Sequence, residues 1–189
     1  TFCVMSRRPA GSTQSSSSAA SEVYKGKEST GGEDVFLIGG IGPLTGEAAS
    51  YGNSVKQGAE IAIAEINAAG GVKVGDKTYK FDMKFEDDEA SEEKSPQAYN
   101  ALMDQGINAV MGCVTSGACI AITDQTAQDG ILQITPSGSA EDCIANDNAF
   151  RICFSDPEQG TAMAEYAVNK LGLKKIAVIY NASDEYSTG

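Results

Sequence analysis

The stretch FLIGGIGPLTG at residues 36–46 is a short apolar run that ends in a loop of Gly, Pro and Thr. The same order recurs in NAVMGCVTSG at residues 108–117 and in ILQITPSGS at residues 131–139, and a helix-like stretch follows each loop. Apolar runs that alternate with helices are typical of parallel strands, whose carboxyl ends meet at one edge of the sheet. Open α/β folds bind small ligands at that edge. The sequence therefore predicts a ligand site made of these loops.

The rest of the chain extends this alternation of strands and helices. Apolar residues at spacings of three and four predict a helix over Val55 to Ile66 that ends at Gly70-Gly71. Alternation from Tyr79 to Phe85 predicts a strand with one wet face, near an edge of the sheet. The other expected elements are strands at 35–41, 109–111 and 131–134, helices at 95–105 and 118–128, and a short strand at the start of FRICF, residues 150–154. The predicted fold class is α/β, with a doubly wound parallel sheet.

Composition separates binding from catalysis. The chain of 189 residues contains no His and carries a net charge of −12. Without His, Ser-His-Asp and Cys-His arrangements and His-ligated zinc are excluded. The acidity argues against a nucleic-acid or anionic-membrane surface, because phosphate contacts need clustered Lys and Arg. Loops of Gly, Ser and Thr offer hydroxyls and backbone amides, so we expect a protein that binds an anionic or zwitterionic small molecule and is not an enzyme.

The chain divides into three parts. Residues 1–33 are rich in Ser, Gly and charged residues and have almost nothing to bury, so we expect a disordered leader or linker. Residues 34–156 are expected to form a first α/β ligand-binding lobe. Residues 157–189 are expected to start a second, truncated lobe, with a helix at 158–171 and a buried strand at 175–180, KIAVIY.

Cys3 is a candidate lipid anchor. Followed by a Ser-rich tract, it resembles the acylated cysteine and linker of a mature bacterial lipoprotein. The alternative is a cysteine without function in a disordered start.

Six motifs resemble one family. They are GGIGPLTGEAASYGNSVKQGAEIAIAEINAAGG, the strand end at Asp87-Asp88, VMGCVTSG, GILQITPSGSA, FRICFSDPEQG and KIAVIYNASDEYSTG. Their order and spacing resemble the type I substrate-binding proteins, periplasmic or lipid-anchored, of branched-chain amino-acid ABC transporters. The resemblance runs from about Val35 to Gly189. It implies two α/β lobes, joined by crossing strands, that hold an amino acid between them.

Ser116 is the first candidate for the ligand head group. It comes immediately before a helix, so its hydroxyl and the following amides would favour a carboxylate. The resemblance implies that Ser116 binds the ligand carboxylate and that Val114 and Thr115 line the same wall. The alternative is that Ser116 only caps its helix.

The loop after the next strand supplies a second set of candidates. The resemblance implies that the carbonyl of Ser137 binds the ligand ammonium, that Gly138 belongs to the same loop, and that the hydroxyl and amide of Ser139 bind the head group. The alternative for this loop is an N-cap, with Glu141 and Asp142 in the first helical turn.

Three further residues are candidates for ligand binding, two by the family resemblance and one by its negative charge. Tyr51, expected in the loop after the first strand, and Tyr186, expected in the loop after the strand at 175–180, match positions where the family places aromatics around the ligand. Each could instead be a surface Tyr that covers apolar neighbours. Asp156 lies at the crossover between the lobes and could pair with an ammonium, or could cap the helix after Pro157.

The cysteines and acidic residues suggest no cofactor. Cys119 and Cys143 are the first candidates for a disulfide, although the four cysteines beyond Cys3 permit three full pairings.

The acidic run at 86–93 is read as a solvated helix start, with a metal site as the alternative. A dinucleotide fingerprint at Gly40-Ile41-Gly42 would need Gly at the position of Thr45.

These observations lead to one functional expectation and two alternatives. The resemblance implies an extracytoplasmic substrate-binding component of an ABC importer, which captures a branched-chain or similar small amino acid and delivers it to a membrane permease. Nucleic acid, metal and cofactors are not expected as partners, and the membrane only through a lipid anchor at Cys3. The first alternative is a ligand-sensing receptor domain of the same fold, for an amide, urea or another amino acid. The second is an α/β enzyme that processes sugars or nucleotides.

Overall fold

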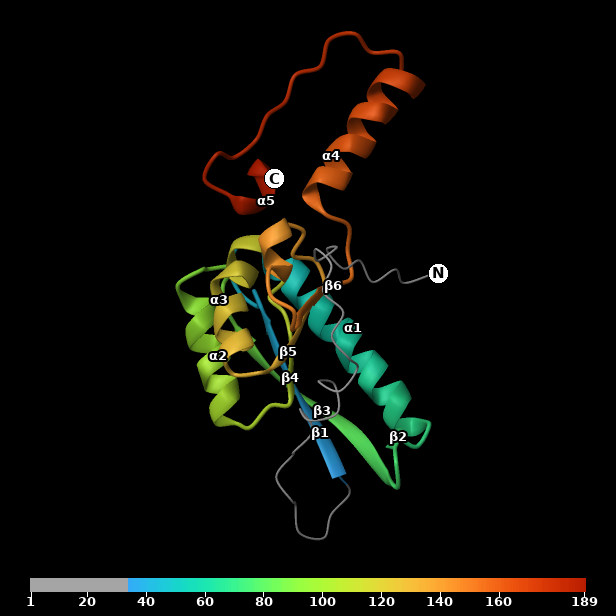
Figure 1. Ribbon diagram of the computed structural model, residues 1–189, viewed down its shortest axis with the longest axis vertical. Helices are drawn as coiled ribbons and strands as arrows, with labels where there is room; N and C mark the ends of the chain where they lie inside the picture. Colours follow the sequence, from blue (N-terminus) through green and yellow to red (C-terminus); the bar gives the residue numbers. More distant parts are fainter. Residues whose placement is uncertain (1–33) are drawn as a thin grey trace, which may run out of the picture.

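A computed structural model describes residues 34–189, which build one six-stranded sheet flanked by helices (Figure 1). The predicted leader and the candidate anchor Cys3 lie outside the described residues. The elements are β1 (Asp34–Gly42), α1 (Ala49–Ala68), β2 (Val72–Val74), β3 (Lys77–Asp87), α2 (Lys94–Asp104), β4 (Ala109–Met111), α3 (Ser116–Gln128), β5 (Leu132–Thr135), the 3₁₀ turn η2 (Glu141–Ile144), β6 (Ala149–Arg151), α4 (Asp156–Glu165), the π-helical turn η3 (Tyr166–Lys170) and α5 (Glu185–Thr188).

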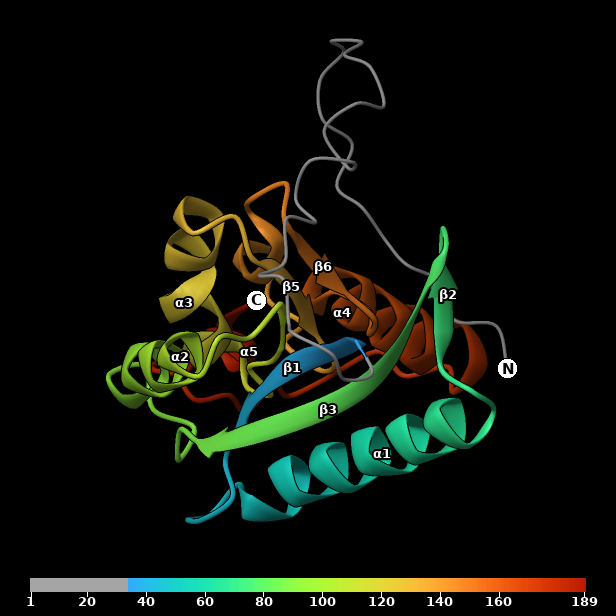
Figure 2. The same cartoon turned by 90° about the horizontal axis from the view of Figure 1, so that it is seen from below.

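The predicted doubly wound parallel sheet is confirmed. The strand order is β2-β3-β1-β4-β5-β6, and every pair except β2–β3 is parallel. Helix α1 covers one face of the sheet, while α2 and α3 pack together on the other face (Figure 2). The main hydrophobic core lies under α2 and α3, around Ile41, Tyr99, Leu102 and Ile122.

The three loops rich in Gly, Ser, Thr and Pro that follow β1, β4 and β5 meet at the carboxyl edge of the sheet. Strands β1, β4 and β5 are adjacent and parallel, so their carboxyl ends point the same way. The loops that follow them, residues 43–48, 112–115 and 136–140, therefore meet at one edge. This convergence is the geometric basis of the candidate site.

β2 is an element that the sequence pattern missed. It pairs antiparallel with β3 through a turn at Gly75, whose φ is +61°. Val72 and Val74 are exposed, so the strand has no apolar face that would produce a recognisable alternation. β3 therefore lies one strand in from the edge, and its predicted wet face is confirmed by exposed Asp82 and Lys84.

The buried strand that we expected at 175–180 is wrong. These residues have no regular structure, and Ile179 is 98% exposed. A strand needs a neighbouring strand to pair with, and within residues 34–189 none lies beside this run. The preceding helix does form, as α4 continued by η3, and Met163 within it and Leu171 directly after it are exposed.

The division into two lobes remains a prediction. Among residues 34–189, no helix combines the length and the apolar character that crossing a bilayer requires.

Gly52 fixes how closely α1 approaches the first loop. It is the buried residue of this helix, and a Cβ on it would lie 1.9 Å from the carbonyl oxygen of Pro43. Gly58 lies in the same helix, and a Cβ there would meet no heavy atom within 4 Å. Of these two glycines, Gly52 is therefore the one that packing requires.

We predict that Gly52→Ala lowers the free energy of unfolding by about 2 kcal/mol, because the backbone at Pro43 has to move. The control Gly58→Ala should raise it by about 0.5 kcal/mol, since Ala favours an open helical position. Urea unfolding of both variants measures the difference. Equal effects of the two substitutions would contradict the close approach.

Candidate functional site

The candidate site lies where the loops after β4 and β5 meet the first turn of α3. Ser116 is the first residue of α3, and its Oγ accepts hydrogen bonds from the backbone amides of Ser139 and Ala140, both at 3.2 Å. Ser116 and Ser139 are each 3% exposed. A hydroxyl can accept two hydrogen bonds and donate one, so the Ser116 hydroxyl keeps its donor.

Two more hydroxyls join the same pair of loops. Thr135 Oγ1 donates to the carbonyl of Cys113 at 2.7 Å and accepts from the amide of Gly138 at 2.8 Å. Ser137 Oγ donates to the carbonyl of Val114 at 2.6 Å. The predicted residues 114–116 and 137–139 therefore form one hydrogen-bonded unit.

Thr115 leaves the N-terminus of α3 uncapped. It is the N-cap residue, yet no side chain makes a capping hydrogen bond there. Its Oγ1 is buried and has no hydrogen-bond partner in the described part of the chain. First-turn amides of a helix attract anions, so a free hydroxyl beside them suits a carboxylate. Val114, which we expected on the same wall, is buried beside it.

The capping alternatives are wrong for these loops. Ser116 follows the N-cap of α3, and the N-cap of η2 is Ala140 without a side-chain cap. One part of the expectation for Ser139 also changes, because its amide is already bonded to Ser116 and only its hydroxyl remains for a ligand. The ligand roles of these residues remain predictions.

Asp156 is a buried carboxylate without a partner. It is 5% exposed, and neither Oδ1 nor Oδ2 has a hydrogen-bond partner among residues 34–189. It does not cap α4, since Ser155 does so in a capping box with Glu158. Its backbone amide donates to the carbonyl of Ser139 at 3.1 Å, which ties it to the candidate site.

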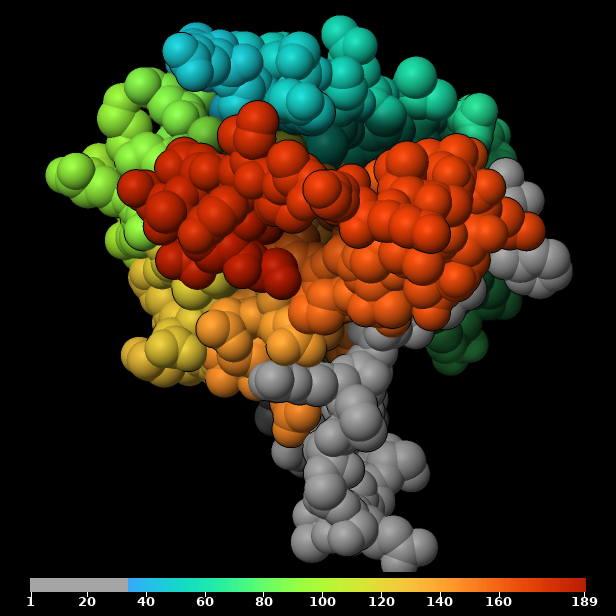
Figure 3. Space-filling model, turned by 90° about the horizontal axis from the view of Figure 1, so that it is seen from above, coloured from blue at the N-terminus to red at the C-terminus, as the bar shows by residue number. Residues whose placement is uncertain are grey.

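The C-terminal residues lie over this edge of the sheet, beside α4 (Figure 3). A Cβ on Gly189 would lie 2.8 Å from Asp156 Oδ2, so this terminus rests on the buried carboxylate. The C-terminal residues and α4, both of which follow β6 in the chain, therefore cover the candidate site.

The two predicted aromatics have different positions from those expected. Tyr51 lies inside the first turn of α1, not in the preceding loop, and is 68% exposed. Tyr186 lies in α5 and is 47% exposed, and its hydroxyl hydrogen-bonds the Gln159 side chain of α4 at 3.1 Å. The structure brings Tyr186 to the covering segment, whereas Tyr51 stays on the helix surface.

The predicted disulfide between Cys119 and Cys143 is absent, and both residues are buried free thiols. Each sulfur already has a hydrogen-bond partner. Cys119 Sγ accepts from Gln133 Nε2 at 3.2 Å, and Cys143 Sγ donates to the carbonyl of Ser116 at 3.6 Å. The hydrogen bond with Cys119 and burial raise the pKa of the Cys143 thiol, so it stays protonated.

A residue that the sequence analysis missed is Arg151, at the end of β6. It is 4% exposed, and its Nη1 donates to the carbonyls of Ser139 at 2.9 Å and Ala140 at 3.0 Å. The only sequence signal is a cation within an otherwise apolar strand.

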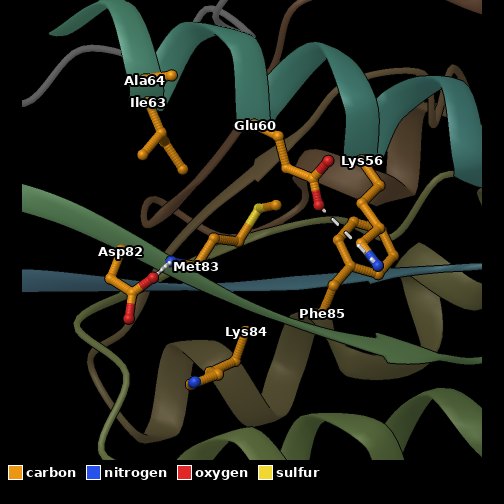
Figure 4. A pocket seen from close by; sticks show the side chains of 8 residues that line it. All are labelled: Lys56, Glu60, Ile63, Ala64, Asp82, Met83, Lys84 and Phe85. Atoms are coloured by element: carbon orange, nitrogen blue, oxygen red, sulfur yellow. Dashed lines mark hydrogen bonds and ion pairs between the residues drawn. The ribbon is translucent and has the colours of Figure 1, made fainter. Parts of the chain in front are cut away.

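A groove between α1 and β3 lies apart from the candidate site. It measures about 380 Å³ and is lined by Lys56, Glu60, Ile63, Ala64, Asp82, Met83, Lys84 and Phe85 (Figure 4). Its Lys56–Glu60 ion pair is long, at 4.0 Å, and exposed. None of the predicted site residues lines this groove. In residues 34–189, no three His, Cys, Asp or Glu side chains are grouped as metal ligands would be.

Asp87 is the last residue of β3 and Asp88 follows it, and their carboxyl groups have pKa values shifted in opposite directions. Asp87 accepts from the amide of Leu44 at 2.8 Å and from Thr45 Oγ1 at 2.6 Å. Burial alone would raise the pKa of Asp87, but these hydrogen bonds outweigh it and hold the pKa below its usual value. Asp88 is fully buried, its Oδ2 has no hydrogen-bond partner in the part of the chain that the structure describes, and burial raises its pKa.

Comparison with known proteins identifies the family. The sequence profile described as "Periplasmic binding protein" matches residues 36–189. The chain belongs to this family. A relative called Leu/Ile/Val-binding protein homolog 3, from Brucella melitensis biotype 1, is 38% identical over 148 residues, which are 77% of this chain and 39% of that protein.

Solved structures agree with this membership. LivJ from Streptococcus pneumoniae, a branched-chain amino acid transporter substrate binding protein in complex with isoleucine, gives a TM-score of 0.74 at 27% identity over 82% of this chain and 44% of LivJ. An ABC transporter substrate-binding protein from Desulfitobacterium hafniense, in complex with Leu, gives 0.69 at 29% identity over the same shares. This member of the periplasmic binding protein family spans about two fifths of the curated relative's length. The resemblance of the six motifs is confirmed, together with the type I lobe.

We predict that Asp87→Asn and Asp88→Asn change the pH dependence of stability in opposite directions. Asp88 has a raised pKa in the folded state, so its ionisation destabilises the wild type as the pH rises above 3.8, the usual pKa of an Asp carboxyl. Asp88→Asn should therefore gain stability relative to the wild type as the pH rises above 3.8.

Asp87 has a lowered pKa in the folded state, so its stabilising contribution is present above 3.8 and is lost as the pH falls below that value. Asp87→Asn should therefore be less stable than the wild type at neutral pH, and this difference should shrink in acid. Urea unfolding across the pH range measures both. Shifts of the same sign in the two variants would contradict the assignment.

Proposed function

We propose that this chain supplies the N-terminal lobe of an extracytoplasmic substrate-binding protein of an ABC importer. The ligand is a branched-chain or similar small amino acid, held between two lobes and passed to a membrane permease. Family membership supports the transport role and the extracytoplasmic location. The names of the relatives and the isoleucine and leucine bound to two similar structures support the ligand class. The protein binds and does not catalyse.

The observation that carries the ligand site is the uncapped N-terminus of α3. Three features there favour a carboxylate. They are first-turn amides without a side-chain cap, a buried Thr115 Oγ1 without a partner, and a Ser116 hydroxyl whose two acceptor positions are filled. Ser116 can then only donate, which matches an acceptor-only ligand group.

The ammonium of an amino acid needs acceptors or a negative charge near the same loops. Asp156 offers an unpartnered buried carboxylate whose backbone is bonded to Ser139. The Ser137 carbonyl and the Ser139 hydroxyl complete the predicted head-group set. Tyr186, on the covering segment, is proposed as the aromatic that closes over the ligand, whereas Tyr51 lies exposed on the surface of α1 and is a ligand contact only by the family resemblance.

Thr115→Val should weaken L-leucine binding about tenfold while raising stability by about 1 kcal/mol. The substitution keeps the shape but removes a buried hydroxyl that costs free energy until a ligand bonds to it. Calorimetry and urea unfolding of the whole protein give the two numbers. The matched control is Thr126→Val, since Thr126 Oγ1 bonds Gln133 at 2.7 Å farther along α3. This control should lose stability and keep its affinity. Unchanged affinity in Thr115→Val would refute the carboxylate site.

Asp156→Asn should weaken L-leucine but not 4-methylpentanoate, which is leucine without its ammonium. The lost charge matters only to a ligand that carries the opposite one. Competition binding to the whole protein measures both affinities. Glu165→Gln removes the same charge from an exposed position in α4 and serves as the control. Equal weakening of both ligands by Asp156→Asn would exclude an ammonium contact.

A further inference from the structure

Arg151 is a buried cation that holds a backbone turn. Within residues 34–189 it has no carboxylate ion-pair partner, and its Nε is buried without a hydrogen-bond partner. Its Nη1 instead donates to two successive carbonyls, those of Ser139 and Ala140. A buried guanidinium is costly unless its hydrogen bonds are made, so these two carbonyls compensate part of the cost of burying the charge.

One peptide unit connects Arg151 with Ser116. The carbonyl of Ser139 and the amide of Ala140 belong to the same planar peptide and point in opposite directions. The carbonyl accepts from Arg151 Nη1 at 2.9 Å, and the amide donates to Ser116 Oγ at 3.2 Å. Fixing the carbonyl therefore fixes the direction of the amide. A cation on the carbonyl also polarises the peptide and strengthens its amide as a donor.

We infer that Arg151 is a positioning residue for the ligand head group, acting through the Ser139–Ala140 peptide on the Ser116 hydroxyl. This inference rests on the proposed function. By holding the Ala140 amide on Ser116 Oγ, Arg151 keeps one acceptor position of that hydroxyl occupied, the Ser139 amide occupies the other, and the hydroxyl proton is directed to a carboxylate. Arg151 touches no ligand in this arrangement.

The same contact joins the site to the crossover after β6. The Ser139 carbonyl also accepts from the backbone amide of Asp156, the first residue of α4. One carbonyl thus receives a donor from the end of β6 and a donor from the helix that leads away from the sheet. Arg151 sets the geometry at this junction.

The test compares Arg151→Met and Arg151→Lys with the wild type in the whole protein, at a temperature well below unfolding. Two quantities are measured, the affinity for L-leucine by calorimetry and the amide hydrogen exchange of residues 137–144 without ligand. Arg151→Met should weaken leucine at least about tenfold and speed exchange in this segment. Arg151→Lys should restore most of both, because an ammonium can donate to both carbonyls.

Each outcome decides the inference. Wild-type affinity in Arg151→Met overturns it, as does Arg151→Lys behaving like Arg151→Met, because a role limited to packing gives no rescue by charge. Thr126→Val controls for lost stability and should leave exchange at 137–144 unchanged. If the wild type does not bind leucine, the proposed function fails, and exchange alone then decides. Faster exchange in Arg151→Met supports the positioning role, and unchanged exchange overturns it.

Discussion

The Ser116 hydroxyl accepts the amides of Ser139 and Ala140, and the candidate site depends on this pair of hydrogen bonds. The two loops that they join follow different strands and are separated by more than twenty residues, so local structure does not set their relative position. The small, buried Ser116 hydroxyl sets this relative position, and fixing so short a side chain loses little conformational entropy. The hydroxyls of Thr135 and Ser137 repeat the connection. Because these loops are already ordered, binding of a ligand does not lose free energy to ordering them.

The parallel sheet brings opposite charges to this edge. Strand β6 ends at Arg151, and the chain reaches Asp156 five residues later. Among residues 34–189, the guanidinium donates to two carbonyls through Nη1, whereas the Asp156 carboxylate has no hydrogen-bond partner. The cation is therefore partly compensated by the protein's own carbonyls, whereas the carboxylate of Asp156 is left without a donor beneath residue Gly189. The zwitterionic ligand that we propose would have its carboxylate at α3 and its ammonium toward Asp156.

The sequence predicted the features that local patterns encode. Apolar runs and Gly-rich turns placed β1, β4 and β5 and, through parallel topology, the meeting of their loops. The exposed side chains of β2 left no such pattern. The run at 175–180 was misjudged because a strand depends on a neighbour that local composition does not reveal. The ligand roles of Ser116 and Thr115 stay predictions, and the capping alternative for Ser116 failed because Thr115 is the N-cap residue of α3. Arg151 was missed because a single cation in an apolar strand has no periodicity, and its partners lie 11 and 12 residues away.

The most direct test of the central claim is a crystal structure of the whole protein with L-leucine. We expect one carboxylate oxygen within hydrogen-bond distance of Ser116 Oγ and Thr115 Oγ1, at the N-terminus of α3, with the amides of Ser139 and Ala140 still bonded to Ser116. Leucine bound with its carboxylate away from α3, or with Ser116 donating to a protein group instead, would contradict it.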